Sequence, residues 1–302
     1  MAGGERVVRM VDVPGARLYT GSVGSGPALM LVAGGGGDAG VYEDVAALLG
    51  ARYTVITFDR RGNSRSAFTE PGAAIDNRAQ ADDVVAVLDA YAVERAHLFG
   101  SSGGAIIALE VLARHGARLL GAVVHEPAVV QLLPGDDPGR RQLAEIWRLA
   151  VEKSPLRAFA AFGVMTAPHM PAVFRSAAGQ AAMAGATRVA LALDSAVRRA
   201  TRKPPSVMTR LLGNADLPMY RELPALCFDY QPDLDALRTI SVPWSIAVGA
   251  DSAGRPYEVA ARALAAEPAM SYVEFPGGHT AYQVQPVPFA ERLLAVVEGA
   301  RR

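Results

Sequence analysis

The stretch FGSSGGAI (residues 99–106) contains the pattern G-x-S-x-G, formed by Gly100, Ser102 and Gly104. An apolar run ending at Gly100 predicts a buried strand before the serine, and apolar residues at helical spacing follow it. A serine between a strand and a helix sits on a sharp turn that exposes its hydroxyl at the carboxyl edge of a sheet. The glycines relieve crowding around such a turn. The stretch therefore predicts a sheet with a candidate nucleophile, Ser102, at its edge.

Strand-like and helical patterns alternate on both sides of this turn. Two short alternating runs around Pro14-Gly15 predict a hairpin at the start of the chain. Continuous apolar runs predict buried strands at 28–33, 53–59, 96–100, 119–126, 244–249 and 270–275. Helical patterns separate most of these runs, so we expect an α/β fold with a mostly parallel, doubly wound sheet.

The regular alternation stops after the first half of the chain. Residues 128–238 carry prolines and helical patterns but no clear strand. We therefore expect a core domain made of residues 1–127 and 239–302, with residues 128–238 inserted as a helical cap. Its larger apolar side chains are candidates to line a pocket or to pack cap against core: Phe159, Phe162, Met165, Met170 and Phe174.

Composition excludes several kinds of partner. The 302 residues carry a net charge of +0, which favours neither nucleic acid nor an anionic membrane surface. Cys227 is the single cysteine, so no disulfide framework is expected. No apolar run is long enough to cross a membrane, and the N-terminus lacks a signal-peptide pattern. We expect a cytoplasmic protein that acts on a small molecule without metal or cofactor; the oligomeric state stays open.

A nucleophilic serine needs a base and an acid that orients the base. His279 follows the last predicted strand in FPGGHTAY, at the same sheet edge as Ser102. Asp251 follows the strand before it, which gives the chain order Ser, Asp, His. The other histidines lie at less suitable places: His97, His115, His125 and His169.

A glycine run after the third predicted strand allows a different interpretation. Gly35, Gly37 and Gly40 form G-x-G-x-x-G, and Asp59 ends the next strand, as in dinucleotide-binding proteins. That interpretation leaves the serine turn, Asp251 and His279 unexplained. It also places the glycine pattern on the third strand, whereas the dinucleotide fold normally begins with it. We therefore interpret Asp59 as part of a turn that braces a loop.

The loop DRRGNSRS (59–66) resembles the D-x-R-G-x-G-x-S loop of α/β-hydrolases, with Ser64 in place of its second glycine. Together with the serine turn, it makes nearly the whole chain similar to capped, lipase- and esterase-like members of that family. The family's His-Gly pair after the third strand appears here as Ala33-Gly34. The resemblance implies an oxyanion hole formed by the backbone N–H groups of Gly35 and Gly103.

The function that this resemblance implies is that of a serine hydrolase. Ser102, His279 and Asp251 would cleave an ester, thioester or lactone of a small, apolar substrate through an acyl-enzyme. Serine at the turn argues against the epoxide hydrolases and haloalkane dehalogenases of this fold, which use aspartate there. Two alternatives stay open, because other members are lyases or cyclases of secondary metabolism, or receptors for small molecules.

The resemblance leaves two candidates for the acid that orients His279. Family members usually carry it at the end of a G-x-x-D turn, but after Gly249 the residue Asp251 comes one position early and Ser252 takes the expected place. Some relatives supply the acid from an earlier strand, which here ends at Glu126. We favour Asp251, because a loop absorbs a shift of one residue, and keep Glu126 as the alternative.

Overall fold

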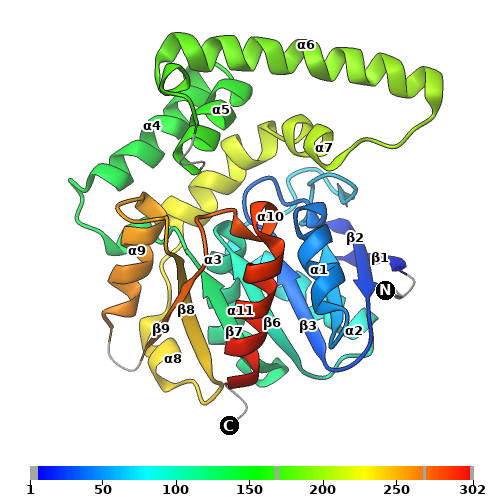
Figure 1. Ribbon diagram of the computed structural model, residues 1–302, viewed down its shortest axis with the longest axis vertical. Coiled ribbons are helices and arrows are strands. Elements are labelled where there is room, and N and C mark those ends of the chain that lie inside the picture. The colour runs from blue at the N-terminus through cyan, green and yellow to red at the C-terminus, as the bar shows by residue number, and fades with distance from the viewer. Residues whose placement is uncertain (1–5, 167–169, 268–269, 300–302) are drawn as a thin grey trace.

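The computed structural model describes residues 6–166, 170–267 and 270–299. Within these ranges a nine-stranded sheet has the strand order β1-β2-β4-β3-β6-β7-β8-β9, with β5 paired to β2 (Figure 1). The strands are β1 (Val7–Val13), β2 (Ala16–Val23), β3 (Ala28–Val32), β4 (Thr54–Phe58), β5 (Ala67–Phe68), β6 (Ala96–Ser101), β7 (Leu119–His125), β8 (Trp244–Gly249) and β9 (Ser271–Phe275). From β4 to β9 in that order all neighbours pair in parallel, which confirms the expected sheet.

The strand order changes direction at β3. The chain passes from β3 to β4 on one side of it, whereas β6 lies on the other side. In open parallel sheets, ligands bind at the carboxyl ends of the strands where the order changes in this way. The glycine run that begins at Gly34 and the serine turn at Ser102 follow β3 and β6 directly. The topology thus brings both sequence features to one crevice.

Helices cover both faces of the sheet. The core helices are α1 (Glu43–Leu49), α2 (Asn77–Ala90), α3 (Gly103–His115), α8 (Leu234–Thr239), α9 (Pro256–Ala265), α10 (Ala281–Val284) and α11 (Pro286–Gly299). Contacts join α1 to α10 and α11 on one face, and α2 to α3 on the other. The short α10 follows His279 closely, and the last helix, α11, begins at Pro286.

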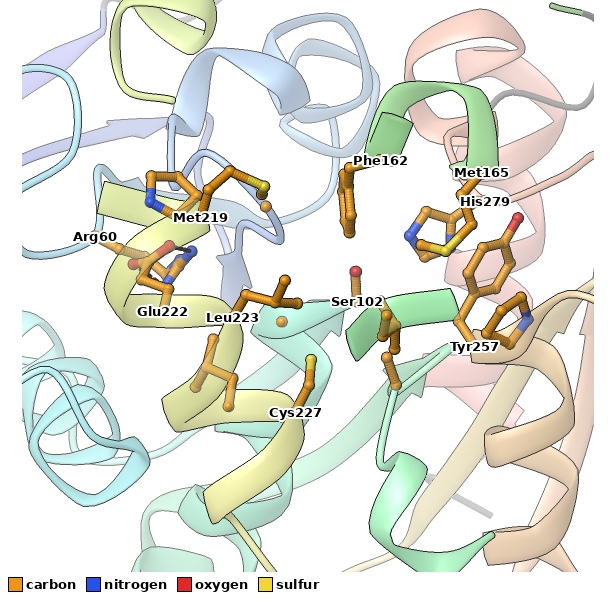
Figure 2. Close-up of a pocket in the computed structure, with 17 residues that line it drawn as sticks. Arg60, Ser102, Phe162, Met165, Met219, Glu222, Leu223, Cys227, Tyr257 and His279 are labelled. Carbon is orange, nitrogen blue, oxygen red and sulfur yellow. Dashed lines mark hydrogen bonds and ion pairs between the residues drawn. The ribbon is translucent and has the colours of Figure 1, made fainter. Parts of the chain in front are cut away.

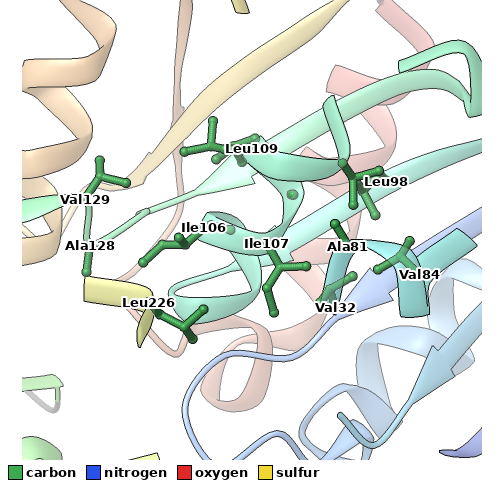
Figure 3. Close-up of a cluster of buried hydrophobic side chains, with 14 of the residues drawn as sticks. Val32, Ala81, Val84, Leu98, Ile106, Ile107, Leu109, Ala128, Val129 and Leu226 are labelled. Carbon is green, nitrogen blue, oxygen red and sulfur yellow. The ribbon is translucent and has the colours of Figure 1, made fainter. Parts of the chain in front are cut away.

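Alternate residues of β3 fill two separate apolar cores. Leu29 and Leu31 pack with α1 and α11, whereas Met30 and Val32 pack with α2 and α3. Figure 3 shows the second cluster, with α3 lying against the strands. Full burial of one such side chain stabilises the fold by about 1.5–3 kcal/mol. Burial on both faces explains why β3 appears in the sequence as a continuous apolar run.

Between β7 and β8 the described residues form helices and connecting loops but no strand. We call residues 128–238 the helical insertion. Its elements are a 3-10 turn (Val130–Leu132), α4 (Pro138–Glu152), α5 (Pro155–Thr166), a 3-10 turn (Ala172–Arg175), α6 (Ala177–Thr201), α7 (Val207–Gly213), two π-helical segments (Pro218–Glu222 and Pro224–Asp229) and the start of α8. Figure 1 shows α4 to α7 above one edge of the sheet. No described helix is long and apolar enough to span a bilayer.

Two ion pairs tie the helical insertion to loops of the sheet. Arg210 of α7 donates to both carboxylate oxygens of Asp38, at 2.6 and 3.0 Å. Glu222 accepts from both terminal nitrogens of Arg60, at 2.7 and 2.8 Å. The carboxylate of Asp38 and both members of the Arg60–Glu222 pair are buried. Since an unpaired buried charge is costly, these contacts fix where the insertion sits above the sheet.

Candidate active site

Ser102 occupies the sharp turn that its sequence pattern predicts. Its backbone has φ 56° and ψ −120°, and its N–H donates to the carbonyl oxygen of His125 at 2.9 Å. A Cβ added to Gly100 would lie 2.3 Å from the carbonyl oxygen of Gly104, and one added to Gly104 would lie 2.2 Å from that of Val32. Both positions of the pattern therefore require glycine. Figure 2 shows the Ser102 hydroxyl pointing into the pocket between Phe162 and His279.

His279, the candidate base, pairs with Glu126. His279 lies in the loop after β9, and its Nδ1 is 2.5 Å from Oε2 of Glu126. The other carboxylate oxygen of Glu126 accepts the N–H of Gly249 at 2.8 Å. His279 is 4% exposed and Glu126 is fully buried. With Nδ1 engaged by the carboxylate, Nε2 is the ring nitrogen left to face the pocket.

Glu126 is ionised despite its burial. Burial alone would raise the pKa of this carboxyl, but the neighbouring His125 and the hydrogen bond from His279 lower it to about 2. The residue itself has φ 51°, a conformation that is uncommon outside glycine. The ring of Tyr257 stacks on His279 with centroids 3.8 Å apart and holds the imidazole from one face. A buried carboxylate and an aromatic face together fix the orientation of His279.

Asp251 is not beside His279, which corrects the expected pairing. The N–H of Asp251 donates to the carbonyl oxygen of Gly277 at 2.9 Å, while its side chain is exposed. No hydrogen bond or ion pair joins the two side chains in the described chain. The turn closes through the N–H of Ser252 and the carbonyl oxygen of Gly249 at 3.0 Å, which buries Ser252 and turns Asp251 outward. A shift of one residue therefore reverses the side to which the carboxylate points.

The glycine loop after β3 runs directly against the serine turn. A Cβ added to Gly34 would lie 2.9 Å from Cβ of Ser102, so only glycine fits there. The next residue, Gly35, lines the same cavity as Ser102 and Gly103. Neither the N–H of Gly35 nor that of Gly103 donates to a protein acceptor within the described ranges. Gly103 is the first residue of α3, where N–H groups have no partner inside the helix.

Asp59 braces the loop that follows β4, as its interpretation from the sequence predicted. Its carboxylate accepts the N–H of Ala39 at 2.8 Å and two nitrogens of Arg65 at 2.6 and 2.8 Å. In the same loop, Arg61 forms a buried ion pair with Asp83. These contacts occupy the carboxylate that the dinucleotide interpretation would have assigned to a ribose.

Ser101 and His125 also form a serine–histidine pair, but it is closed off from the cavity. Oγ of Ser101 is 3.0 Å from Nδ1 of His125, but both residues are fully buried. Phe99, Phe275 and Phe289 surround the His125 ring. Burial keeps substrate from Ser101, so Ser102 remains the candidate nucleophile.

The remaining histidines do not reach the site. His97 is buried on β6, and His115 contacts Asp82 at the end of α3. His169 lies outside the described residues. Among the residues that the structure describes, no group of three or more His, Cys, Asp and Glu side chains could hold a metal ion.

Two apolar cavities meet at Ser102 and His279. The small chamber, about 40 Å³, is bordered by Gly35, Gly103 and residues of the insertion such as Met165 and Cys227. The large chamber, about 380 Å³, is lined by residues of α5, α6 and α7, including Phe159, and by Met170 between α5 and α6. Phe162 borders both, whereas Phe174 lines neither. Burial raises the pKa of the Cys227 thiol to about 12, so it stays neutral in the small chamber.

The charged end of the small chamber was not among the features predicted from the sequence. Arg60 and Glu222 line it, and Figure 2 shows them on the side of the pocket away from His279. Arg60 stands at a variable position of the DRRG loop, and Glu222 belongs to the insertion, 162 residues further along the chain. No sequence pattern links the loop after β4 to this part of the insertion. Only the fold brings them together.

Comparison with known proteins agrees with this architecture. A model of the alpha/beta hydrolase family matches residues 29–292. The chain is 32% identical over 297 residues to the uncharacterized hydrolase YraK of Bacillus subtilis strain 168, covering 97% of this chain and 96% of the relative. The enol-lactonase of Burkholderia xenovorans LB400 has a TM-score of 0.66 at 19% identity, covering 96% of this chain and 100% of that one. The carboxylesterase CesB of B. subtilis also has a TM-score of 0.66 at 19% identity, covering 98% and 92%. The chain belongs to the alpha/beta hydrolase family.

Proposed function

We propose that the protein is a serine hydrolase whose triad is Ser102, His279 and Glu126. The observation that carries this proposal is the contact of 2.5 Å between His279 Nδ1 and a buried carboxylate, beside a serine on a strained turn. A carboxylate on Nδ1 keeps a neutral imidazole in the tautomer whose Nε2 accepts a proton. The chain order Ser, acid, His is the one usual for this fold.

In this mechanism Ser102 Oγ attacks a substrate carbonyl while His279 Nε2 takes its proton. The N–H groups of Gly35 and Gly103 donate to the oxyanion of the tetrahedral intermediate. One such donor contributes about 3–4 kcal/mol to lowering the barrier in other serine hydrolases. His279 then protonates the leaving group, and water attacks the acyl-enzyme by the same route in reverse. Glu126 stabilises the imidazolium that forms in both steps.

The proposed substrate is a small, largely apolar ester, thioester or lactone. Its support is the apolar lining of both chambers and the names of two structural relatives, an enol-lactonase and a carboxylesterase. Residues 128–238 would act as a cap over the core formed by residues 1–127 and 239–302. Methionines of this segment, such as Met165 and Met170, adapt readily to apolar groups of different shape.

A fluorophosphonate probe tests the nucleophile, because it phosphonylates serines that a base activates. We expect the wild type and Ser101→Ala to be labelled, and Ser102→Ala to be unlabelled and at least about 10³-fold slower on p-nitrophenyl butyrate. Ser101→Ala is the matched control, since it removes the neighbouring hydroxyl. Undiminished labelling of Ser102→Ala would refute the proposed nucleophile, and absence of ester turnover by the wild type would refute the hydrolase.

A further inference from the structure

We propose that Arg60 and Glu222 position the peptide group between Gly34 and Gly35. Through this pair, the carboxylate of Glu222 in the helical insertion sets the direction of one oxyanion donor, the N–H of Gly35. The inference rests on the proposed function for its kinetic consequence. Neither residue touches the reacting atoms in the proposed mechanism. Both therefore act as positioning residues.

The pair is bidentate and buried. Nη1 of Arg60 donates to Oε1 of Glu222 at 2.7 Å, and Nη2 donates to Oε2 at 2.8 Å. The side chains are 1% and 3% exposed. Gln80 accepts from Nη1 at 2.5 Å, and Asn63 donates to Oε1 of Glu222 at 2.9 Å. The guanidinium plane is thus held from several sides, which fixes where the second N–H of Nη2 points.

The second N–H of Nη2 contacts the glycine loop. Nη2 of Arg60 also donates to the carbonyl oxygen of Gly34 at 2.9 Å. This carbonyl belongs to the same peptide group as the N–H of Gly35, and no cis peptide bond occurs in the described chain. In a trans peptide the C=O and N–H point in opposite directions, so holding the Gly34 oxygen aims the Gly35 N–H. A cationic donor on the oxygen also polarises the peptide and strengthens its N–H as a donor.

Glycine makes this support necessary. Residues without a side chain have wide conformational freedom, and the loop contains four glycines in succession. The N–H of Gly37 also donates to the Gly34 oxygen at 3.1 Å, but it lies within the same loop. Arg60 instead connects the peptide to a carboxylate of the helical insertion. The position of the insertion is thereby coupled to the orientation of the Gly35 N–H, the proposed oxyanion donor.

The neighbouring pair Arg61–Asp83 provides a matched control. It is also bidentate and buried, with contacts of 2.7 and 2.6 Å and side chains 3% and 2% exposed. Its other hydrogen bonds go to the carbonyl oxygens of Ala74 and Ala79, away from the glycine loop. Substitution there removes a buried ion pair of the same loop without touching the Gly34 peptide.

The kinetic test compares Glu222→Gln and Arg60→Met with Arg61→Met. We expect the first two to lower kcat on p-nitrophenyl butyrate about 10- to 100-fold with KM changed less than threefold, because removing an oxyanion donor outright costs about 10²–10³-fold. The Ki of a trifluoromethyl ketone, whose adduct with serine carries an oxyanion, rises in parallel. We expect Arg61→Met to keep kcat within threefold of the wild type, even if its Tm falls as far as the Tm of the other two variants. Equal loss of kcat in all three variants would overturn the proposal.

A double variant guards against failure to fold. Arg60→Met combined with Glu222→Met replaces the ion pair by apolar side chains of similar volume, an exchange that buried pairs often tolerate. We expect it to fold and still to lose kcat about 10- to 100-fold, since the Gly34 oxygen has lost its cationic donor. Wild-type kcat in this variant would contradict the proposed role.

A spectroscopic readout decides the positioning claim without activity. With glycine labelled at its carbonyl carbon and its nitrogen, an HNCO spectrum shows only consecutive glycine pairs, including Gly34–Gly35. We expect the Gly34–Gly35 signal to move in Glu222→Gln and in the double methionine variant, but not in Arg61→Met. An unmoved signal in Glu222→Gln would overturn the inference even if the wild type hydrolyses no ester. The inference would also be overturned if the signal moved in Glu222→Gln while kcat stayed at the wild-type value.

Discussion

His279 and Glu126 meet through a hydrogen bond of 2.5 Å, although 153 residues separate them in the chain. The contact spans from the end of β7 to the loop after β9, across β8. Gly249, the last residue of β8, donates its N–H to the same carboxylate. Three neighbouring strand ends therefore build one acid–base pair.

The first prediction concerns the pH dependence of stability. His125 is fully buried, and burial lowers its pKa from 6.5 to about 4. Between these values the unfolded chain binds a proton that the folded chain does not, so lowering the pH through this window destabilises the fold. We expect the unfolding free energy of the wild type to fall more steeply than that of His125→Gln between pH 6.5 and 4, by up to about 1.4 kcal/mol per pH unit. Urea unfolding at several pH values measures both slopes, and equal slopes would contradict the prediction.

The glycines of the serine turn give a second prediction. An added Cβ at Gly104 would lie 2.2 Å from a backbone oxygen that cannot move aside, whereas nothing lies within 4 Å of one at Gly163 in α5. We expect Gly104→Ala to lose several kcal/mol of unfolding free energy or to fail to fold. Gly163→Ala is the control and gains roughly 0.5–1 kcal/mol, because alanine favours a helix interior. Similar Tm values for the two variants would show that the turn is less crowded than described.

A third prediction concerns the acyl group. Both chambers that reach Ser102 have mainly apolar linings, so a longer acyl chain buries more apolar surface in the transition state. We expect kcat/KM on p-nitrophenyl esters to rise from acetyl to about hexanoyl. A panel of acyl lengths, run beside a set of lactones, measures this. A strict preference for acetyl or for charged acyl groups would be inconsistent with apolar chambers.

Much of the fold could be predicted because local pattern and tertiary environment agree. The run at β3 is apolar throughout and is buried on both faces, and the helical spacing of Val84, Val87 and Leu88 matches their burial on α2. The serine turn could be placed because its glycines have no alternative in that backbone. Each of these features depends on residues close together in the sequence.

The acid of the site could not be predicted in this way. Asp251 and Glu126 both follow strands at the correct edge, and only the closure of the Gly249–Ser252 turn decides which carboxylate faces inward. The Arg60–Glu222 pair could not be predicted from the sequence for the same reason. Its members belong to different segments, and the seating of the helical insertion brings them together. Side-chain direction in loops and contacts between distant segments are set by the tertiary structure.

The most direct test of the triad compares Glu126→Gln with Asp251→Asn in the same steady-state assay on p-nitrophenyl butyrate. Glutamine keeps the shape of Glu126 but removes the charge that orients His279, and loss of the orienting acid costs up to about 10⁴-fold in a serine protease. Asp251 is exposed and makes no contact with His279, so its substitution serves as the control. We predict that Glu126→Gln lowers kcat by several orders of magnitude and that Asp251→Asn changes it less than tenfold. A large loss in Asp251→Asn with nearly normal turnover in Glu126→Gln would contradict the account.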